Sequence, residues 1–146
     1  MTWQDYESTL LALTIWRESR GEPQETQLWV AWAIRNRAVR KGWWNPSGTL
    51  TGALTQPLQF SSTTKPGDRQ LTTWPTFLLR AGSYVPDPSF LQAMNLADQV
   101  TGTDITKDPT GGSDSFFDDS IKPPKGWTQD RFRGKKGRML FYQMLS

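Results

Sequence analysis

The stretch IWRESRGEPQETQLWVAWAIRNR, residues 15–37, predicts two consecutive helices joined by a tight turn. The first helix is expected over about residues 7–19, where Leu11, Ile15 and Glu18 recur at helical spacing and share one face. The sequence therefore places a carboxyl group where a helix usually buries hydrocarbon. Glu18 is consequently either a solvated surface acid or a buried group that is a candidate catalyst.

The second helix is expected over residues 23–40. Gly21 is typical of a helix end, and Pro23 is favoured in the first turn of the helix that follows. The centre of this helix, residues 28–34, is apolar on nearly every side, which predicts a central buried helix. Gly42 is expected to end it.

The remaining elements are expected to be fewer and mostly shorter. The pattern predicts a short helix over residues 50–55 and a third long helix over residues 86–102. The segments SFF and MLFYQML, residues 115–117 and 139–145, are typical of strands. Residues 43–86 otherwise carry turn signals, which predict loops with at most a small hairpin.

The length and composition limit the fold and the chemistry. A chain of 146 residues suits a single domain over residues 1–146, and the order of elements predicts an α+β, predominantly helical fold with a small β element. The chain contains neither Cys nor His, which excludes disulfides, thiolate metal sites, Ser-His-Asp triads and the usual catalytic zinc sites. Acid–base chemistry must then use carboxylates, Lys or Tyr, and we expect no metal and no cofactor.

The charge favours anionic partners. The net charge of +3 and the pI near 9.4 reflect basic clusters at residues 40–44 and 130–138, which suit nucleic acid, a membrane surface or the bacterial wall. Ordinary solvated surface explains these clusters equally well. The 8 Trp residues are typical of clefts that stack flat ligands such as sugars, although protein cores also use Trp. No apolar run reaches transmembrane length, and the first residues lack the basic region of a secretion signal.

Glu18 is expected at the C-terminal end of the first helix, on its apolar face. Desolvation and the negative end of the helix dipole are both expected to raise the pKa of this carboxyl group. A carboxyl group that is partly protonated near neutral pH suits a general acid that protonates a glycosidic oxygen. The competing interpretation is a structural Glu18 paired with a core arginine such as Arg37.

A series of short motifs runs from Glu18 through most of the chain. In order, they are Glu18-Ser19-Arg20-Gly21-Glu22, Gln27, Asn36-Arg37, QFS at 59–61, DPTGG at 108–112, Phe116-Phe117, Trp127 and the closing Gly137, Phe141 and Tyr142. Their order and spacing resemble the SleB-type cell wall hydrolases, also called spore-cortex-lytic enzymes. The first block is quite specific, whereas QFS and DPTGG alone are weak signals.

The resemblance implies a two-lobed fold similar to lytic transglycosylases and goose-type lysozyme, with Glu18 on the floor of a cleft. It also implies cleavage of the peptidoglycan glycan strand after N-acetylmuramic acid. Glu18 then donates a proton to the leaving oxygen and takes one back from the C6 hydroxyl of the muramic acid, which closes a 1,6-anhydro ring. This route needs neither a second carboxylate nor a metal.

The resemblance further implies residues that contact the substrate. These are Ser19, Gln59 and Ser61 as polar contacts, and Phe116, Phe117 and Trp127 as an aromatic wall that desolvates Glu18 and stacks a sugar ring. Core packing explains each of the aromatic residues equally well. Glu22 is close to Glu18 in sequence, but Gly21 separates it from the helix face, so we interpret it as a structural residue at the start of the second helix.

The chain departs from the family pattern near the expected strands. Ser115 stands where a His or Tyr is common, Phe117-Asp118 where an aromatic residue and Asn are usual, and Met139 where a His is frequent. Asp118 and Asp119 in turn place two further carboxylates near the expected cleft. If one of them lies across the scissile bond from Glu18, a hydrolytic, muramidase-type reaction becomes available.

Two other classes of function compete with this reading. One is a non-catalytic module that binds cell wall, and the other is a nucleic-acid-binding domain, for which the sequence lacks a known signature. The expected partner is bacterial peptidoglycan, with no nucleic acid, no stable membrane insertion and a monomeric chain. The missing signal suits a phage endolysin that is made in the host cytoplasm, released by a holin-type partner and active at the cell wall.

Overall fold

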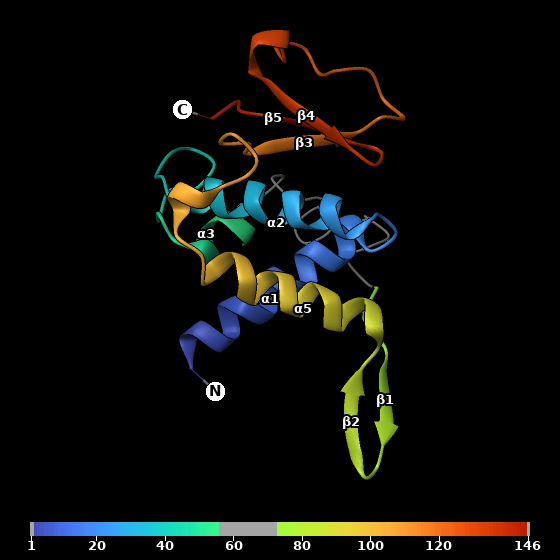
Figure 1. Ribbon diagram of the computed structural model, residues 1–146. Helices are drawn as coiled ribbons and strands as arrows, with labels where there is room; N and C mark the ends of the chain where they lie inside the picture. Colours follow the sequence, from blue (N-terminus) through green and yellow to red (C-terminus); the bar gives the residue numbers. More distant parts are fainter. Residues whose placement is uncertain (1, 56–72, 146) are drawn as a thin grey trace.

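The structure, a computed structural model, describes residues 2–55 and 73–145 (Figure 1). The helices are α1 (Trp3–Ser19), α2 (Gln24–Ala38), α3 (Leu50–Thr55) and α5 (Pro88–Thr101), with 3-10 turns at Ile105–Lys107 and Gln129–Arg131, and the strands are β1 (Phe77–Arg80), β2 (Ser83–Pro86), β3 (Ser115–Asp118), β4 (Phe132–Lys136) and β5 (Met139–Tyr142). The expected α+β fold, mainly helical with a small β element, is confirmed.

Helix α1 begins earlier than the apolar pattern predicts. Thr2 and Asp5 form a capping box, in which the Thr2 N–H donates to Asp5 Oδ2 at 2.8 Å and the Asp5 N–H donates to Thr2 Oγ1 at 3.1 Å. These bonds satisfy two of the amides that a helix start leaves without partners. Leu11 and Ile15 are fully buried, so the apolar face of α1 is the face that the sequence indicates.

Helix α2 is the predicted central helix, but it ends at Ala38 rather than near Gly42. The chain turns back there, and two side chains beyond the helix take its last carbonyl groups. The Trp44 indole N–H donates to the Arg37 carbonyl at 3.1 Å, and the amide of the buried Asn45 donates to the Ala38 carbonyl at 3.3 Å. These bonds replace the helical ones and fix the end of α2.

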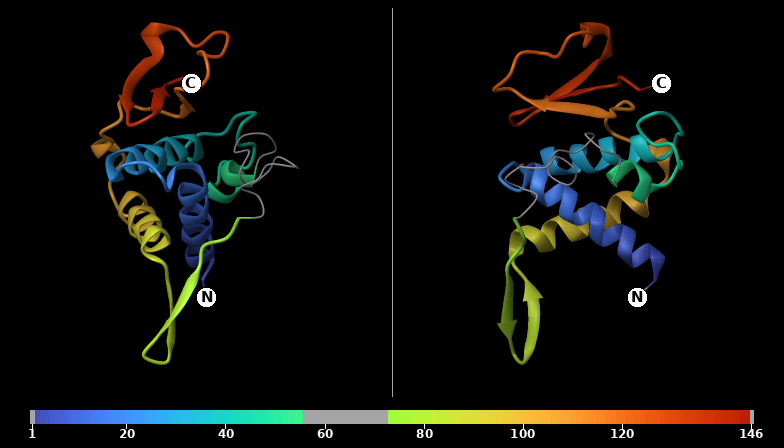
Figure 2. Two further views of the ribbon diagram at one scale, coloured as in Figure 1. Left: turned by 90° about the vertical axis from the view of Figure 1, so that its right-hand side faces the viewer. Right: turned by 180° about the vertical axis from the view of Figure 1, so that it is seen from behind.

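The hydrophobic core lies where α1, α2 and α5 pack together, as Figure 1 and the two views of Figure 2 show. Trp32, Val30 and Ile34 of α2 are buried in it, together with Phe90 and Val100 of α5. No helix among the described residues is long and apolar enough to span a membrane.

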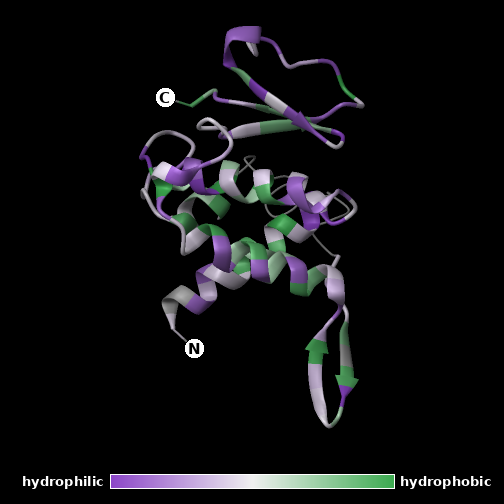
Figure 3. Ribbon diagram, viewed as in Figure 1, coloured by the Kyte–Doolittle hydropathy of each residue, from purple (hydrophilic) through white to green (hydrophobic). Residues whose placement is uncertain are grey.

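The small hairpin expected before the third long helix is β1–β2. Ala81 and Gly82 form its turn with φ angles of 49° and 82°, which is the backbone that a tight antiparallel turn requires. The hairpin projects away from the helices (Figure 2). Parts of both strands are hydrophobic, green in Figure 3. The exposed residues of the hairpin include Leu79 and Tyr84.

The second sheet is antiparallel in the order β3-β5-β4 and stacks against α2 (Figure 1). Phe141 of β5 is fully buried and lies edge-on to Trp29 of α2, at 5.3 Å between ring centroids. β4 is not among the strands predicted from the sequence. Its residues, FRGKK, are too polar to show a strand pattern, and pairing with β5 creates the strand through a bulge between Phe132 and Gly134.

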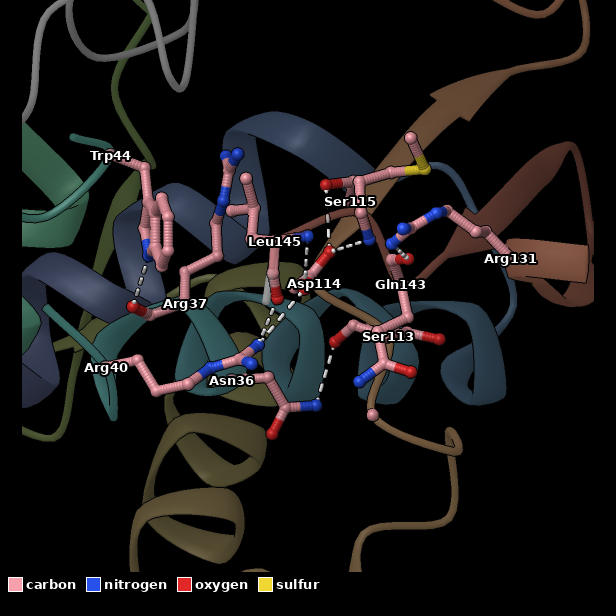
Figure 4. A network of polar contacts seen from close by, with 12 residues as sticks. Asn36, Arg37, Arg40, Trp44, Ser113, Asp114, Ser115, Arg131, Gln143 and Leu145 are labelled. Carbon is pink, nitrogen blue, oxygen red and sulfur yellow. Dashed lines mark hydrogen bonds and ion pairs between the residues drawn. The ribbon is translucent and has the colours of Figure 1, made fainter. Parts of the chain in front are cut away.

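A buried carboxylate joins the end of the chain to the helices (Figure 4). Asp114 is fully buried and accepts the backbone N–H groups of Met144 and Leu145 at 2.7 and 2.9 Å. It also accepts the Ser115 hydroxyl at 3.0 Å and pairs with Arg40 of the α2–α3 connection at 3.3 Å. The network holds the segment after β5 against the helical part of the fold.

Candidate active site

A cleft of about 360 Å³ opens where α1 ends and the chain turns into α2. The described residues that line it are residues 17–22 and Arg138, which lies in the turn between β4 and β5. The first motif of the sequence therefore forms one side of the cleft, and the small sheet contributes to the other. This arrangement agrees with the expectation of helices and a β element on either side of a cleft.

Glu18 is half-buried and lies in this cleft. It is the penultimate residue of α1 and lies on the same helix face as the fully buried Leu11 and Ile15. The apolar residues of this face are buried, whereas Glu18, near the end of the helix, is partly exposed to solvent. A carboxyl group in that position has a desolvated side and an open side, which suits proton transfer to a bound ligand.

Two arginines flank Glu18, and aromatic rings hold both. Arg17 is buried, its Nε–H donates to the Thr73 carbonyl at 3.0 Å, and its guanidinium carbon lies 4.5 Å from the ring centroid of Trp74. The guanidinium carbon of Arg20 lies 4.2 Å from the ring centroid of Trp16. Cation–π contacts of this kind restrain the two side chains, which line the cleft together with Glu18.

Ser19 is buried in the wall of the cleft, next to Glu18. Its hydroxyl donates to the carbonyl of Ile15, one helical turn back, at 2.8 Å. The hydroxyl proton is therefore used within α1, and the oxygen lone pairs are what Ser19 offers to a substrate. Its role as a polar contact stays a prediction.

Glu22 combines the expected structural role with a place in the cleft. The Gln27 side chain donates to its backbone carbonyl at 2.9 Å, which closes the turn into α2. Its carboxylate accepts the backbone N–H of Arg138 at 3.4 Å and so joins the turn to the small sheet. Among the described residues, Glu22 is the other carboxylate that lines the cleft besides Glu18.

The aromatic residues predicted as a cleft wall lie elsewhere. Phe117 and Trp127 contact each other at 5.3 Å between ring centroids, and both contact Tyr142, at 5.6 and 5.1 Å. Phe116 lies on the opposite face of β3, where it packs against the core and Phe141 at 5.8 Å. Since neighbouring residues on a strand point to opposite faces, Phe116 and Phe117 cannot form one wall. None of the three lines the described part of the cleft.

Asp118 and Asp119 are held outside the described lining of the cleft. Asp118 pairs with Arg138 at 3.5 Å, and Asp119 pairs with Lys135 at 3.3 Å and with Arg138 at 3.6 Å. The pKa of Asp118 is lowered, mainly because its carboxylate accepts the backbone N–H of Ser120. The structure thus places Arg138, rather than either aspartate, at the cleft.

Other motif residues serve the fold. The Asn36 amide of α2 donates to Asp108 at 2.9 Å and to the Ser113 carbonyl at 2.8 Å, so it ties the DPTGG turn to the helices. Asp108 in turn accepts the backbone N–H groups of Thr110 and Gly112.

Burial lowers the pKa of Arg37 to about 10, although the negative charge of Asp114 acts to raise it. The predicted contacts Gln59 and Ser61 lie outside the described residues.

A second hollow, of about 410 Å³, lies between α1, α3 and α5, where Glu7, Ser8 and Asp98 are among its lining residues. Its described lining includes none of the residues predicted to act on a substrate. Arg17, Arg20 and Arg138 are absent from the predicted set although they line the cleft with Glu18. Arg17 directly precedes the motif of residues 18–22 and Arg20 belongs to it, whereas Arg138 is brought to the cleft by tertiary structure alone.

The comparisons with known proteins agree with this fold. Residues 21–142 match the family model described as cell wall hydrolase, a range that begins three residues after Glu18. The catalytic domain of the germination-specific lytic transglycosylase SleB from Bacillus anthracis is similar, with 22% identity and a TM-score of 0.64 over 97% of this chain and 96% of that chain. So is the catalytic domain of the Bacillus cereus SleB protein, with 25% identity and a TM-score of 0.65 over 97% and 92%. The search of curated proteins finds no match.

Proposed function

Because the chain belongs to the cell wall hydrolase family, we propose that it cleaves the glycan strand of peptidoglycan between N-acetylmuramic acid and N-acetylglucosamine, with Glu18 as its general acid and base. Membership makes the chain an enzyme of the bacterial cell wall rather than a non-catalytic wall-binding module. The observation that carries the finer proposal is the position of Glu18, half-buried at the end of α1 and in the cleft.

The proposed reaction uses one carboxyl group twice. Protonated Glu18 donates its proton to the glycosidic oxygen, and the bond between that oxygen and C1 of the muramic acid breaks through an oxocarbenium-like state. The C6 oxygen of the same sugar then bonds to C1, and its proton passes to the Glu18 carboxylate. The products are a strand with a 1,6-anhydro end and a regenerated acid, and no water is consumed.

Two observations support this lytic transglycosylase route. One of the similar structures is named as a lytic transglycosylase. Asp118 and Asp119, the residues predicted as the second carboxylate of a hydrolytic mechanism, are engaged with basic side chains outside the described cleft lining. A hydrolytic reaction has a different second carboxylate available, because Glu22 lines the same cleft as Glu18.

Mass analysis of the fragments released from purified peptidoglycan tests the product. We expect fragments that end in anhydro-muramic acid. Fragments heavier by one water would contradict the intramolecular ring closure and would make Glu22→Gln the next variant to measure. If the purified enzyme releases no glycan fragments at all, the proposed function is wrong.

A further inference from the structure

Within the described part of the chain, Arg138 is the one cleft residue that comes from outside residues 17–22. The turn formed by Gly137 and Arg138 packs closely against the start of α2. Gly137 has a φ of 55°, and a Cβ on it would lie 2.5 Å from Glu22 Oε2 and 2.8 Å from Thr26 Oγ1. This close approach, together with the bond from the Arg138 N–H to Glu22, fixes the backbone of Arg138 at the cleft.

The side chain of Arg138 is oriented but accessible. Its Nη2 lies 3.5 Å from Asp118 Oδ1 and its Nε lies 3.6 Å from Asp119 Oδ1, while 64% of the side chain stays exposed. Exposed pairs of this length contribute little energy, so they orient the guanidinium without saturating it. Of its five N–H donors, the two on Nη1 have no partner among the described residues.

The other two arginines of the cleft are already engaged. Arg17 is buried, donates to the Thr73 carbonyl and stacks on Trp74. Arg20 is held over the ring of Trp16 and its Nη1 reaches the Trp16 carbonyl at 3.5 Å. Among the described residues of the cleft, Arg138 is therefore the cation with the most exposed side chain and a fixed backbone.

We propose that Arg138 is a specificity residue that binds a carboxylate on the lactyl substituent of muramic acid, an inference that rests on the proposed function. Muramic acid differs from its neighbouring sugar by a lactyl group, which ends in a free carboxylate or carries a stem peptide with carboxylates of its own. A guanidinium binds a carboxylate through paired, charge-assisted hydrogen bonds. Arg138 thus makes the enzyme prefer strands that carry this negative charge.

The test compares soluble glycan strands in three forms. One form keeps its stem peptides, and a second is treated with an amidase so that each lactyl group ends in a carboxylate. In the third, all carboxylates of either preparation are converted to neutral amides. The kinetic constants kcat and KM are measured for wild type, Arg138→Gln, Arg138→Lys and Lys135→Gln. Lys135 is the matched control because it also pairs with Asp119 but does not line the cleft.

We expect Arg138→Gln to raise KM about tenfold on carboxylate-bearing strands, the loss of one partly exposed charge-assisted contact, with kcat nearly unchanged. The variant and wild type should have equal KM on the neutral strands, Arg138→Lys should recover part of the loss, and Lys135→Gln should match wild type. A loss on stem-bearing strands alone assigns the carboxylate to the peptide, and a loss on stripped strands assigns it to the lactyl group.

Two results would overturn the inference while leaving the proposed function intact. One is an unchanged KM for Arg138→Gln on every strand, and the other is an equal rise on neutral and acidic strands, which would indicate a structural effect. Thermal unfolding of each variant identifies any loss of fold. If Arg138→Gln does not fold, KM of Arg138→Lys on acidic and neutral strands is compared with that of wild type instead. If wild type cleaves none of the strands, the proposed function itself fails.

Discussion

At the residue scale, the buried carboxylate of Asp114 joins the end of the chain to the helical part of the fold. It accepts two backbone N–H groups beyond β5 and pairs with the partly exposed Arg40, while its own side chain is fully buried. Removing one member of such a group leaves buried donors and a charge without a partner, which costs more than the contacts contribute. Asp114 therefore attaches the last residues to the helical part of the fold, together with Arg40, which also donates to the Leu145 carbonyl.

We therefore expect Asp114→Ala to lower the free energy of unfolding by about 3–5 kcal/mol, as measured by urea denaturation. Asp119→Ala is the matched control, because Asp119 makes only exposed ion pairs, and it should cost less than about 1 kcal/mol. If the two variants unfold at the same urea concentration, the Asp114 network does not anchor the chain end.

Reasoning from the sequence predicts the position of Glu18 at the end of its helix, but it does not identify Arg138 as a cleft residue. Glu18 is located by the periodicity of its own helix, which local spacing reveals. Arg138 reaches the cleft because Gly137 and Glu22 dock a turn that is distant in sequence. No local pattern records that contact.

At the element scale, helix ends depend on side chains that cap them. Asp87 caps α5 by accepting the backbone N–H of Phe90 at 3.1 Å, and it also accepts the Thr76 N–H at 3.0 Å. Its pKa is lowered, chiefly by the hydrogen bond from the Ser89 hydroxyl. The same residue thus joins the start of α5 to the strand segment before it.

Asp87→Ala should lower the free energy of unfolding by about 1 kcal/mol at pH 7, while Asp87→Asn keeps a capping oxygen and should lose less. Because folding depresses the pKa of Asp87, its carboxylate stabilises the fold above the ordinary value of 3.8, and this contribution is lost as the pH falls through the folded value. The gap between wild type and Asp87→Asn should accordingly narrow below about pH 4 in urea titrations. A gap that stays constant with pH would show that the charge has no part in the cap.

The outer face of the β3-β5-β4 sheet makes a second element-scale prediction. Trp127 packs on Phe117 and Tyr142 there, away from the described cleft lining. Trp127→Ala should therefore lower the free energy of unfolding by about 2–3 kcal/mol, and with it the melting temperature. KM for the glycan should stay unchanged. The control is Trp43→Ala, since 67% of Trp43 is exposed and its loss should change neither quantity. A raised KM at unchanged stability would return Trp127 to the substrate site.

At the scale of the whole molecule, the helices and their order follow from the sequence, and the assembly of the cleft only partly does. Long apolar periodicities predict α1, α2 and α5 because each helix must bury its own stripe. Strand β4 is missed because its five residues, three of them charged, become a strand only when β5 pairs with them. A motif gives the order of Phe116, Phe117 and Trp127, but only the sheet decides which face each one occupies.

The most direct test of the central claim is the release of glycan fragments from purified peptidoglycan by wild type, Glu18→Gln and Glu25→Gln. Glutamine keeps the shape of Glu18 but has no carboxyl proton to donate, and Glu25 is the control because it is exposed and outside the described cleft lining. The account predicts that Glu18→Gln loses at least about a hundredfold in rate, the usual scale of general acid catalysis, while Glu25→Gln behaves as wild type. Equal rates for Glu18→Gln and wild type would contradict it.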